Sequence, residues 1–446
     1  MDRPTSIALP IRKNPFSLPA SLRRRNEPRL TFDLLRSRSP QFRTILTELQ
    51  ALRPGPRKPR IISSAHGRIK TVLLTYPAYG ANEYSYRNVY VDLIKNLPKT
   101  TRYIILSHPS VVQDLKAVLK EGKATRRAII VESPEYVQFL VWSQDPYVIV
   151  EDVGIKAKTI YFIEPFTFRR ASDAVISDLI AEATAFQNLQ SPLYFQGGNV
   201  LIGDDFVLVG ADYPAHTLNL VEQTGHIRVP DDVDPAQFIK ELYQNTFDPA
   251  RRIIYVGTKI PVPQYQTREI MVNGETWQEE IYLGTGETQP IFHIDMFISL
   301  AGKSKSGKYR LLVGSPEMAD DLLDRPPIPH AMSEIFDDIA RSLKKLGFII
   351  RRNPLPLTYV DDPLGKLRTW YFATANNCIV QIDGDSNTVW LPTYGHGDWA
   401  DLAIIDEKNK QIWQGLGFNT IQLTDFHPFA QNLGAVHCIT KYLKRI

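Results

Sequence analysis

The apolar residues of this chain follow two periods, one typical of helices and one typical of strands. Apolar positions three and four residues apart predict five amphipathic helices after residue 66. These helices cover residues 107–122, 170–189, 234–247, 329–348 and 398–418. Runs rich in Val, Ile and Tyr predict strands beside them. The strands cover residues 69–77, 102–107, 126–133, 199–210, 251–257, 309–314, 368–382 and 419–423.

The spacing of the predicted helices indicates five repeated units. The helices begin about 63, 64, 95 and 70 residues apart, which is too long and too irregular for a helical solenoid. The long interval contains Asn273-Gly274 between alternating apolar residues, which predicts a hairpin inserted near residues 265–285. Five helix-plus-strand units favour one closed α/β assembly over residues 66–446. An ordinary α/β sheet with five helices is the alternative that periodicity leaves open.

The composition places the chain among soluble globular proteins. Of its 446 residues, 43% are hydrophobic and 22% are charged. The sequence has no apolar run long enough for a membrane helix, and its first thirty residues lack the apolar block of a signal peptide. We therefore expect a cytoplasmic protein that makes no membrane contact. Its two cysteines cannot build a disulfide framework or a four-cysteine zinc site.

The basic character of the chain is confined to its first part. Residues 1–60 contain 14 Lys and Arg against 4 Asp and Glu, so the other 386 residues sum to a charge of −6. This part also holds nine of the 32 prolines. We expect residues 1–65 to form a poorly packed leader with one short helix at 39–52. Without interleaved aromatic residues, its basic runs favour a solvated or partner-bound arm over a nucleic-acid-binding element.

One motif has the spacing of a phosphate-binding loop but lacks the other features of such a loop. Residues 302–308 have the spacing of a phosphate-binding loop, but Tyr309 stands where a Ser or Thr would hold magnesium. Strand-like residues lie on both sides, whereas a phosphate loop needs a helix to follow it. A basic hairpin turn is the better interpretation.

Several weaker signals involve residues capable of chemistry. "FHIDMFISL" is predicted to be a strand, which would project His293 and Asp295 from the same face. Asp145, followed by proline, is expected near a strand end. Taken alone, the pair His293 and Asp295 is more typical of a solvated strand face, and the isolated Asp145 is more typical of a turn or a cap.

Glycines, asparagines and cysteines supply the other signals. A Gly197-Gly198 pair precedes a predicted hairpin that turns at residues 203–205, and paired glycines allow close approach to the backbone. Asn377 precedes a strand, and Cys378 beside it fits a core thiol. Cys438 follows a histidine near the end of the sequence.

A cysteine, a histidine and two carboxylates are the set needed to hydrolyse a guanidinium group. Carboxylates can hold the N–H edges of the cation through charge-assisted hydrogen bonds. A thiolate can attack the central carbon, and a histidine can shuttle protons. Few other reactions require this combination.

The same residues lie in motifs that resemble the guanidino-group-modifying enzymes, the pentein superfamily. The motifs "WSQDPY", "QGGN", "HID", "NN" and "VHC" run in family order from about residue 140 to 440. The resemblance implies a five-bladed pseudosymmetric α/β propeller. It implies Asp145 and Asp295 as guanidinium-binding carboxylates, His293 as general acid/base and Cys438 as nucleophile. The remaining substrate-binding positions that it implies are Trp142, Gly198, Asn199 and Asn377.

The chain also departs from this family. Agmatine and arginine deiminases usually have Arg and Glu where this chain has Gln144 and Gln196, so His293 is expected to be less basic here. "WxQD" and "VHC" are instead similar to peptidylarginine deiminases. A deiminase acting on peptidyl arginine is therefore expected, without metal or cofactor.

The sequence leaves three alternatives of function open. They are an agmatine or free-arginine deiminase, an amidinotransferase of the same superfamily, and a non-enzymatic pentein-fold binding protein. A homo-oligomer is also left open.

Overall fold

The computed structural model describes Arg12 and residues 55–81, 84–154, 159–264, 266–281, 286–384 and 386–446. The helix expected at 39–52 lies outside these residues. Two observations bear on the leader. Strand β1 (Pro59–Ile61) pairs with β5 (Val148–Asp152), so the sheet structure begins before residue 66. Arg12 is buried, and its guanidinium donates to the Thr358 hydroxyl at 3.0 Å.

Five of the six sheets in the described residues share one core topology. In each, a first strand pairs antiparallel with a second, and the second pairs parallel with a third. The triplets are β5, β6 (Ile160–Glu164) and β7 (Gln187–Gln190); β8 (Val200–Ile202), β9 (Phe206–Gly210) and β10 (Arg252–Val256); β13 (Ile298–Lys303), β14 (Tyr309–Ser315) and β15 (Ile349–Pro354); β18 (Ile379–Gln381), β19 (Thr388–Thr393) and β20 (Asn419–Asp425); and β21 (Lys441–Arg445), β2 (Ile69–Tyr76) and β3 (Arg102–Ser107). The five repeated units predicted from periodicity are thus present as repeated sheets.

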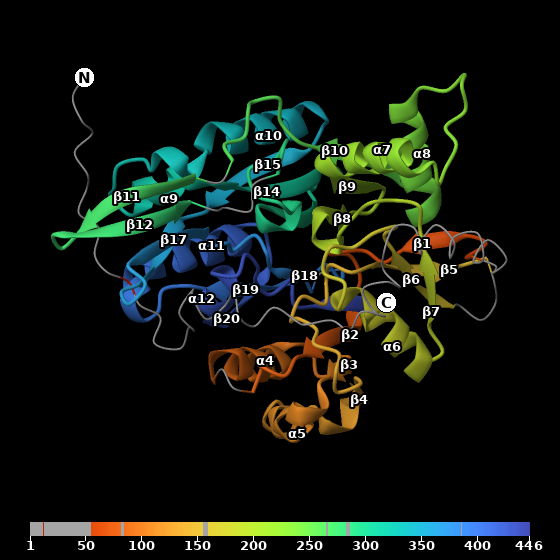
Figure 1. The fold of residues 1–446 in the computed structure, drawn as a ribbon, viewed down its shortest axis with the longest axis horizontal. Helices are drawn as coiled ribbons and strands as arrows, with labels where there is room; N and C mark the ends of the chain where they lie inside the picture. Colours follow the sequence, from red (N-terminus) through yellow and green to blue (C-terminus); the bar gives the residue numbers. More distant parts are fainter. Residues whose placement is uncertain are drawn as a thin grey trace.

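Helices connect the parallel strands, because a parallel pair needs a crossover. The crossovers contain α4 (Tyr84–Asn96), α6 (Ile176–Ala183), α7 (Asp212–Thr224) with α8 (Pro235–Phe247), α9 (Pro316–Leu322) with α10 (Ser333–Lys345), and α11 (Ala403–Gly415). A further helix, α5 (Val112–Glu121), leads from β3 to β4 (Ala128–Glu132), and the short α12 (His427–Ala430) follows β20. In Figure 1, α5, α6, α8 and α10 lie at the periphery, whereas β8, β18 and β2 lie nearer the centre.

Several sequence predictions need correction. The helices α4 and α7 were not predicted, and the first of them is the crossover of the β21-β2-β3 unit. The helix expected over 170–189 ends at Ala183, because residues from Gln187 onward pair with β6 as β7. The strand expected over 368–382 is interrupted between β17 (Leu367–Phe372) and β18.

The inserted hairpin forms as predicted. Strands β11 (Gln266–Val272) and β12 (Glu275–Ile281) meet at Asn273 and Gly274, whose φ angles of 50° and 81° are typical of such a turn. The hairpin joins β17 and β16 (Leu357–Asp362) in a sixth sheet. Likewise, β13 and β14 flank the turn at residues 304–308, so the phosphate-loop spacing belongs to a basic hairpin as expected.

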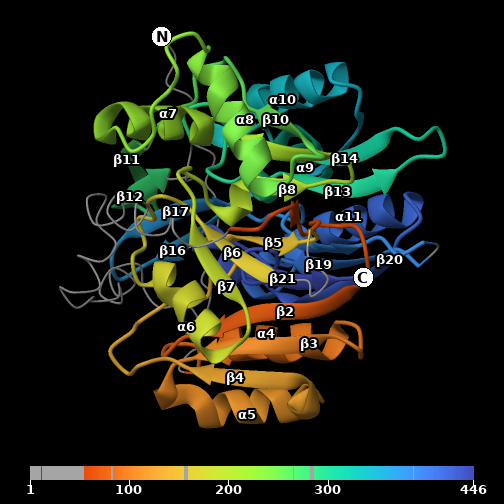
Figure 2. The same cartoon turned by 90° about the vertical axis from the view of Figure 1, so that its right-hand side faces the viewer.

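The core is made by the inward faces of these sheets and helices. The β2-β3-β4 sheet, for example, packs against α4 and α5, and Figure 2 shows these layers at one end of the molecule. Among the described residues, none of the helices has the length and apolarity required to cross a membrane.

Candidate active site

The residues singled out from the sequence occupy one recurring position in the fold. In every unit, they lie immediately before the first strand of the triplet. Asp145 precedes β5, Gly198 precedes β8, His293 and Asp295 precede β13, Asn377 precedes β18, and Cys438 precedes β21. Each repeated unit therefore contributes to one cluster, and hydrogen bonds connect the contributing segments.

Asp145 is buried and forms an ion pair with Arg170, which was not among the predicted site residues. Its Oδ2 accepts a hydrogen bond of 2.7 Å from Arg170 Nη2, and Arg170 Nε donates to Asp173 Oδ2 at 2.8 Å. Burial by itself would raise the pKa of Asp145, but the charges of His293, Arg170 and Lys441 outweigh it and hold that pKa below its ordinary value. Asp145 Oδ1 has no hydrogen-bond partner among the described residues.

His293 lies against this free oxygen. Its Nδ1 is 3.7 Å from Asp145 Oδ1, and its Nε2 is 2.9 Å from Gln196 Oε1. Because an amide oxygen only accepts, Nε2 carries the hydrogen and Nδ1 keeps a lone pair directed at the cluster. Burial lowers the pKa of His293, although the nearby Asp145 and Asp295 oppose this. Burial therefore favours the neutral form of the imidazole.

Gly198 keeps space open between these groups. A Cβ atom at this position would lie 2.5 Å from His293 Nδ1, 3.1 Å from Asp145 Oδ1 and 3.2 Å from Asp295 Oδ2. Any other residue would therefore occupy the point where the carboxylates and the imidazole meet. This geometry fits the expectation that the Gly197-Gly198 pair allows other groups to approach the backbone closely.

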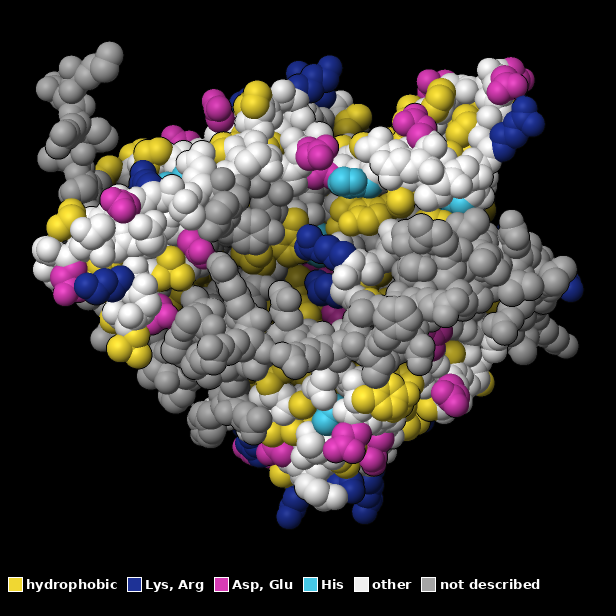
Figure 3. Space-filling view, in the orientation of Figure 1, with side chains coloured by type: hydrophobic (Ala, Val, Ile, Leu, Met, Phe, Trp, Pro, Cys, Tyr) yellow, Lys and Arg dark blue, Asp and Glu magenta, His cyan; other side chains and the backbone are white. Residues whose placement is uncertain are grey.

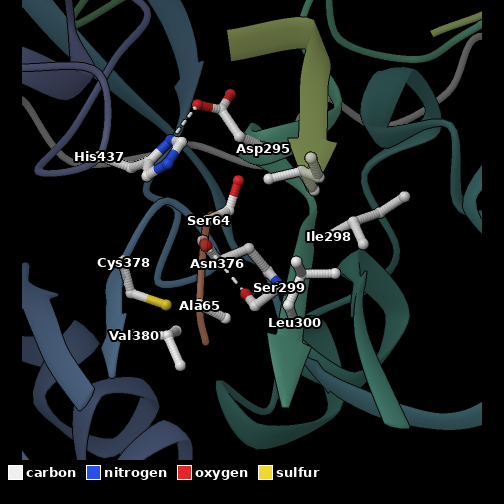
Figure 4. Close-up of a pocket in the computed structure, with 11 residues that line it drawn as sticks. Ser64, Ala65, Asp295, Ile298, Ser299, Leu300, Asn376, Cys378, Val380 and His437 are labelled. Atoms are coloured by element: carbon white, nitrogen blue, oxygen red, sulfur yellow. Dashed lines mark hydrogen bonds and ion pairs between the residues drawn. The ribbon is translucent and has the colours of Figure 1, made fainter. Parts of the chain in front are cut away.

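Asp295 is held by a second histidine. Asp295 Oδ2 lies 2.7 Å from His437 Nδ1 and 3.8 Å from Cys438 Sγ. Its other oxygen, Oδ1, has no hydrogen-bond partner among the described residues. Figure 4 shows the His437 ring directed at this carboxylate. Asp295 thus keeps one oxygen free, as Asp145 does.

Asn377 organises the segment that carries the thiol. Its Oδ1 accepts hydrogen bonds from the backbone N–H groups of Ala435, His437 and Cys438, at 3.2, 3.0 and 3.1 Å. Its Nδ2 donates to Cys438 Sγ at 3.1 Å. One side chain therefore fixes the turn before β21 and the position of the sulfur.

The two cysteines occupy different environments. Burial raises the pKa of the Cys378 thiol to about 12, and this residue lies in the core as predicted. Burial also raises the pKa of the Cys438 thiol, with Asp295 and Asp145 adding to the effect, while the hydrogen bond from Asn377 opposes it. Cys438 is thus a protonated thiol that faces two carboxylates, and a cation placed between them would favour the thiolate.

Trp142 and Asn199 support the cluster. Trp142 packs over Gly434, where a Cβ would lie 2.3 Å from its ring, and contacts Phe429 edge to face. Asn199 Oδ1 accepts from the backbone N–H of Ile294 at 3.0 Å and so fixes the segment that bears His293. Contact of either residue with a substrate stays a prediction.

The predicted strand at "FHIDMFISL" is partly wrong. Residues Ile294–Met296 form a 3₁₀ turn, and the strand begins only at Ile298. Strand alternation therefore does not place His293 and Asp295 together. The turn does so, held at its start by Asn199.

A small cavity lies behind the Asp295–His437 pair. It has a volume of about 20 Å³ and is lined by Ser64, Ser299, Cys378 and neighbouring side chains (Figure 4). That volume suits about one water molecule and not a guanidinium. On the face shown in Figure 3, basic side chains lie in a central hollow bordered by apolar ones. Within the described residues, no group of three His, Cys, Asp or Glu side chains is arranged to hold a metal ion.

The structure is a mixed α/β fold in which five repeated sheets contribute to one polar cluster. The structure is similar to the agmatine deiminase of C. jejuni, with a TM-score of 0.54 and 13% identity over 87% of this chain and 97% of that one. It is equally similar to "a putative peptidyl-arginine deiminase", with the same TM-score and identity over 87% of this chain and 100% of the other. No protein-family model and no curated protein matches the sequence. The chain thus has the fold of these deiminases, which confirms that part of the motif resemblance.

Proposed function

We propose that this protein is a cysteine-dependent deiminase that converts a guanidino group to a ureido group and releases ammonia. One observation carries the proposal. The thiol of Cys438 faces a cluster in which Asp145 Oδ1, Asp295 Oδ1 and His293 Nδ1 are buried without hydrogen-bond partners among the described residues. Buried polar atoms without partners are costly, so such a set indicates a ligand that supplies them.

The charge of these atoms favours a guanidinium. Two carboxylate oxygens can accept from the N–H groups at two edges of the flat cation. An ester or amide substrate would develop negative charge on its oxygen, which requires N–H donors, whereas Asp145 and Asp295 would repel it. The site thus fits a cation whose central carbon can lie against the sulfur.

The reaction follows from this placement. The Cys438 thiol loses its proton to His293 Nδ1, and the thiolate forms a C–S bond to the guanidinium carbon. The tetrahedral carbon then breaks one C–N bond, and the leaving nitrogen takes the proton from His293 and departs as ammonia. A water molecule next adds to the amidino-thioether carbon while His293 accepts its proton. The C–S bond then breaks, the hydroxyl proton passes to the leaving sulfur to restore the thiol, and the ureido product forms. His293 releases the proton it took from water to the departing ammonia or to solvent.

Formation of the thiolate depends on the substrate in this mechanism. In the absence of a ligand, burial and the two aspartates keep the Cys438 thiol protonated. A bound guanidinium brings positive charge next to the sulfur and so lowers the pKa of the thiol. The site is then reactive only when it is occupied.

For the substrate, we propose peptidyl arginine, supported by the "WSQD" and "VHC" motifs and the second solved structure. Agmatine and free arginine are the alternatives, supported by the first structure. For the fold, we propose that the five repeated sheets form the blades of a pseudosymmetric propeller. Its support is that each sheet supplies the cluster from the same position, before its first strand.

The two aspartates give the sharpest test. Asp145→Asn and Asp295→Asn each preserve size but remove the charge that binds the cation. We expect each to lower kcat/KM by about thirty-fold to several-thousand-fold, equivalent to about 2 to 5 kcal/mol. Asp231→Asn, on an exposed loop, is the matched control and should leave kcat/KM unchanged.

The assay is ammonia and ureido product released from agmatine, free arginine and an arginine peptide, after the fold of each variant is checked by circular dichroism. A folded aspartate variant that kept more than about a third of wild-type kcat/KM, under about 1 kcal/mol, would contradict the proposal. Guanidine binding without turnover by the wild-type protein would instead indicate a non-enzymatic binding protein. Transfer of the amidino group to an added amine would indicate an amidinotransferase.

A further inference from the structure

One arginine of the basic leader lies buried on the body of the protein. Arg12 is 8% exposed, and it contacts strand β16 and the short helix at Gly397–Leu402. Its partners there, Thr358 and Asp401, lie 346 and 389 residues away along the chain. Arginine is rarely buried without partners, so the groups around Arg12 define a binding site.

The guanidinium of Arg12 is bound by two separate elements. Nη1 donates to the Thr358 hydroxyl at 3.0 Å, and Nη2 donates to Asp401 Oδ2 at 2.6 Å. The Arg12 Cζ also lies 5.1 Å from the centroid of the Tyr359 ring, which is within the range of a cation–π contact. These partners suit the flat, forked guanidinium better than the compact ammonium of a lysine.

The backbone of Arg12 is held as well. Its carbonyl oxygen accepts a hydrogen bond of 2.9 Å from the Asp361 N–H, and its own N–H donates to Asp361 Oδ2 at 3.2 Å. Arg368 fixes this carboxylate, because its Nε and Nη2 donate to Asp361 Oδ1 and Oδ2 at 2.8 and 3.0 Å. The site therefore binds a stretch of backbone together with an arginine side chain.

The outer edge of β16 is covered by side chains along part of its length. This strand is the last one in the β11-β12-β17-β16 sheet. Along an antiparallel strand, alternate residues turn their N–H and C=O groups away from the neighbouring strand. Two carbonyls of this outward-facing series, those of Leu357 and Tyr359, accept from Arg325 Nη2 at 2.9 Å and from Trp399 Nε1 at 3.1 Å.

Asp361 is the next residue in the outward-facing series, and its N–H meets the Arg12 carbonyl. Without Arg12, this N–H would stay unpaired at the edge of a sheet. Unpaired edges of this kind pair readily with other chains. Arg12 thus completes the cover that Arg325 and Trp399 begin.

We propose that the leader docks through Arg12 into a second guanidinium-binding site and so covers the edge of β16. The site consists of Thr358, Tyr359, Asp361 and Asp401, none of which belongs to the cluster around Cys438. Its occupant is a segment of the same chain. This inference does not rest on the proposed function, because its test requires no turnover.

Hydrogen exchange of the Asp361 amide, followed by NMR in the full chain, measures the docking directly. In Arg12→Ala, this exchange should accelerate at least about ten-fold, since the segment loses the contacts that hold it on β16. Arg12→Lys should accelerate it as well, because an ammonium lacks the planar fork. The Thr358 and Val360 amides face β17 and should keep their rates, which shows that the sheet is intact.

Two further variants complete the test. Asp401→Asn removes the charge at a partly exposed partner and should also accelerate Asp361 exchange. Arg228→Ala, which breaks a largely exposed ion pair to Asp231, is the matched control and should leave that exchange unchanged.

Three outcomes would overturn parts of the proposal. An unchanged Asp361 rate in Arg12→Ala would exclude the docking, and Asp401→Asn decides the matter if Arg12→Ala does not keep the sheet intact. A wild-type rate in Arg12→Lys would show that the site does not select a guanidinium. Protection of the wild-type Asp361 amide that is lost on dilution would mean that the leader of a second copy fills the site.

Discussion

The guanidinium of Arg170 lies 2.7 Å from one oxygen of Asp145, and the other oxygen has no hydrogen-bond partner in the part of the chain that the structure describes. The ion pair between Arg170 and Asp145 limits how Asp145 can bind a second cation. With Oδ2 engaged, Asp145 can offer only Oδ1 to a second cation, so it binds by one edge oxygen. Arg170 also helps to keep Asp145 ionised, because the charge of a guanidinium does not titrate in the physiological range.

The first prediction concerns this arginine. Arg170→Ala should lower the free energy of unfolding at pH 7 by about 3 to 5 kcal/mol, because it leaves Asp145 and Asp173 buried without their cation. The pKa of Asp145 is depressed in the folded state, so its contribution to stability is present above the ordinary carboxyl pKa and is lost as pH falls through the folded value. The deficit of the variant should therefore shrink as the pH is lowered.

Urea denaturation over a pH series measures this deficit. Arg228→Ala, which removes a largely exposed ion pair to Asp231, should change nothing measurable. Equal stabilities of wild type and Arg170→Ala at pH 7 would show that the buried pair is not a structural link.

The second prediction separates the two thiols. Cys438→Ser should fold normally but lose turnover, because a serine hydroxyl is a far poorer nucleophile than a thiolate. Cys378→Ser should keep activity, since burial raises the pKa of this thiol to about 12 and Asn377 donates to Cys438 Sγ, which lies 3.8 Å from Asp295. Ammonia release by both variants is the measurement. Normal turnover in Cys438→Ser would exclude the covalent mechanism.

The third prediction tests the open space at Gly198. Gly198→Ala places a methyl group 2.5 Å from His293 Nδ1, so the guanidinium can no longer lie between the carboxylates. Turnover should fall at least a hundred-fold, the scale expected when reacting groups are displaced by about an ångström. Gly415→Ala is the matched control, because its Cβ would meet nothing within 4 Å and helices favour alanine. If Gly198→Ala retained turnover like the control, the substrate would have to bind elsewhere.

The fourth prediction concerns Gln196, the amide at Nε2 of His293. Gln196→Glu places a negative charge 2.9 Å from that nitrogen and should raise the pKa of His293 by about one unit or more. Burial keeps the pKa of His293 low in the wild-type protein, so His293 in the variant should stay protonated to higher pH. The pH optimum for ammonia release should rise accordingly, whereas Gln411→Glu, on the exposed side of α11, should leave it in place. An unmoved optimum in Gln196→Glu would argue against His293 as the proton carrier.

Local sequence chemistry predicted the turns well. The hairpin at Asn273 and Gly274 needs positive φ at both positions, and only a few residue types accept this. The helix α8 also begins where expected, because Asp234 caps it and proline follows. By contrast, α4 was missed because its aromatic and β-branched residues favour strands, and packing against the sheet decides its structure.

The site was predictable only as far as its motifs extend. Arg170, His437 and Lys441 are absent from the predicted set, and each joins the cluster through a contact to a distant part of the chain. Their partners lie 25, 142 and 297 residues away in the sequence, at Asp145, Asp295 and Gln144 respectively. For His437 a signal existed in the "VHC" motif itself. For Lys441, nothing local distinguishes a buried lysine from an exposed one on the same strand.

The pairing of β21 with β2 also has a consequence for biosynthesis. Strand β2 ends at Tyr76, but its antiparallel partner is complete only once the ribosome has passed Arg445. During most of translation, the edge of β2 that pairs with β21 therefore stays unpaired. Unpaired strand edges promote aggregation, and chaperones cover such surfaces. Cys438 lies just before β21, so the thiol reaches Asp295 and Asn377 only in this last docking step. Under the proposed mechanism, a nascent chain therefore gains activity only when the sheet that contains β21 and β2 is complete.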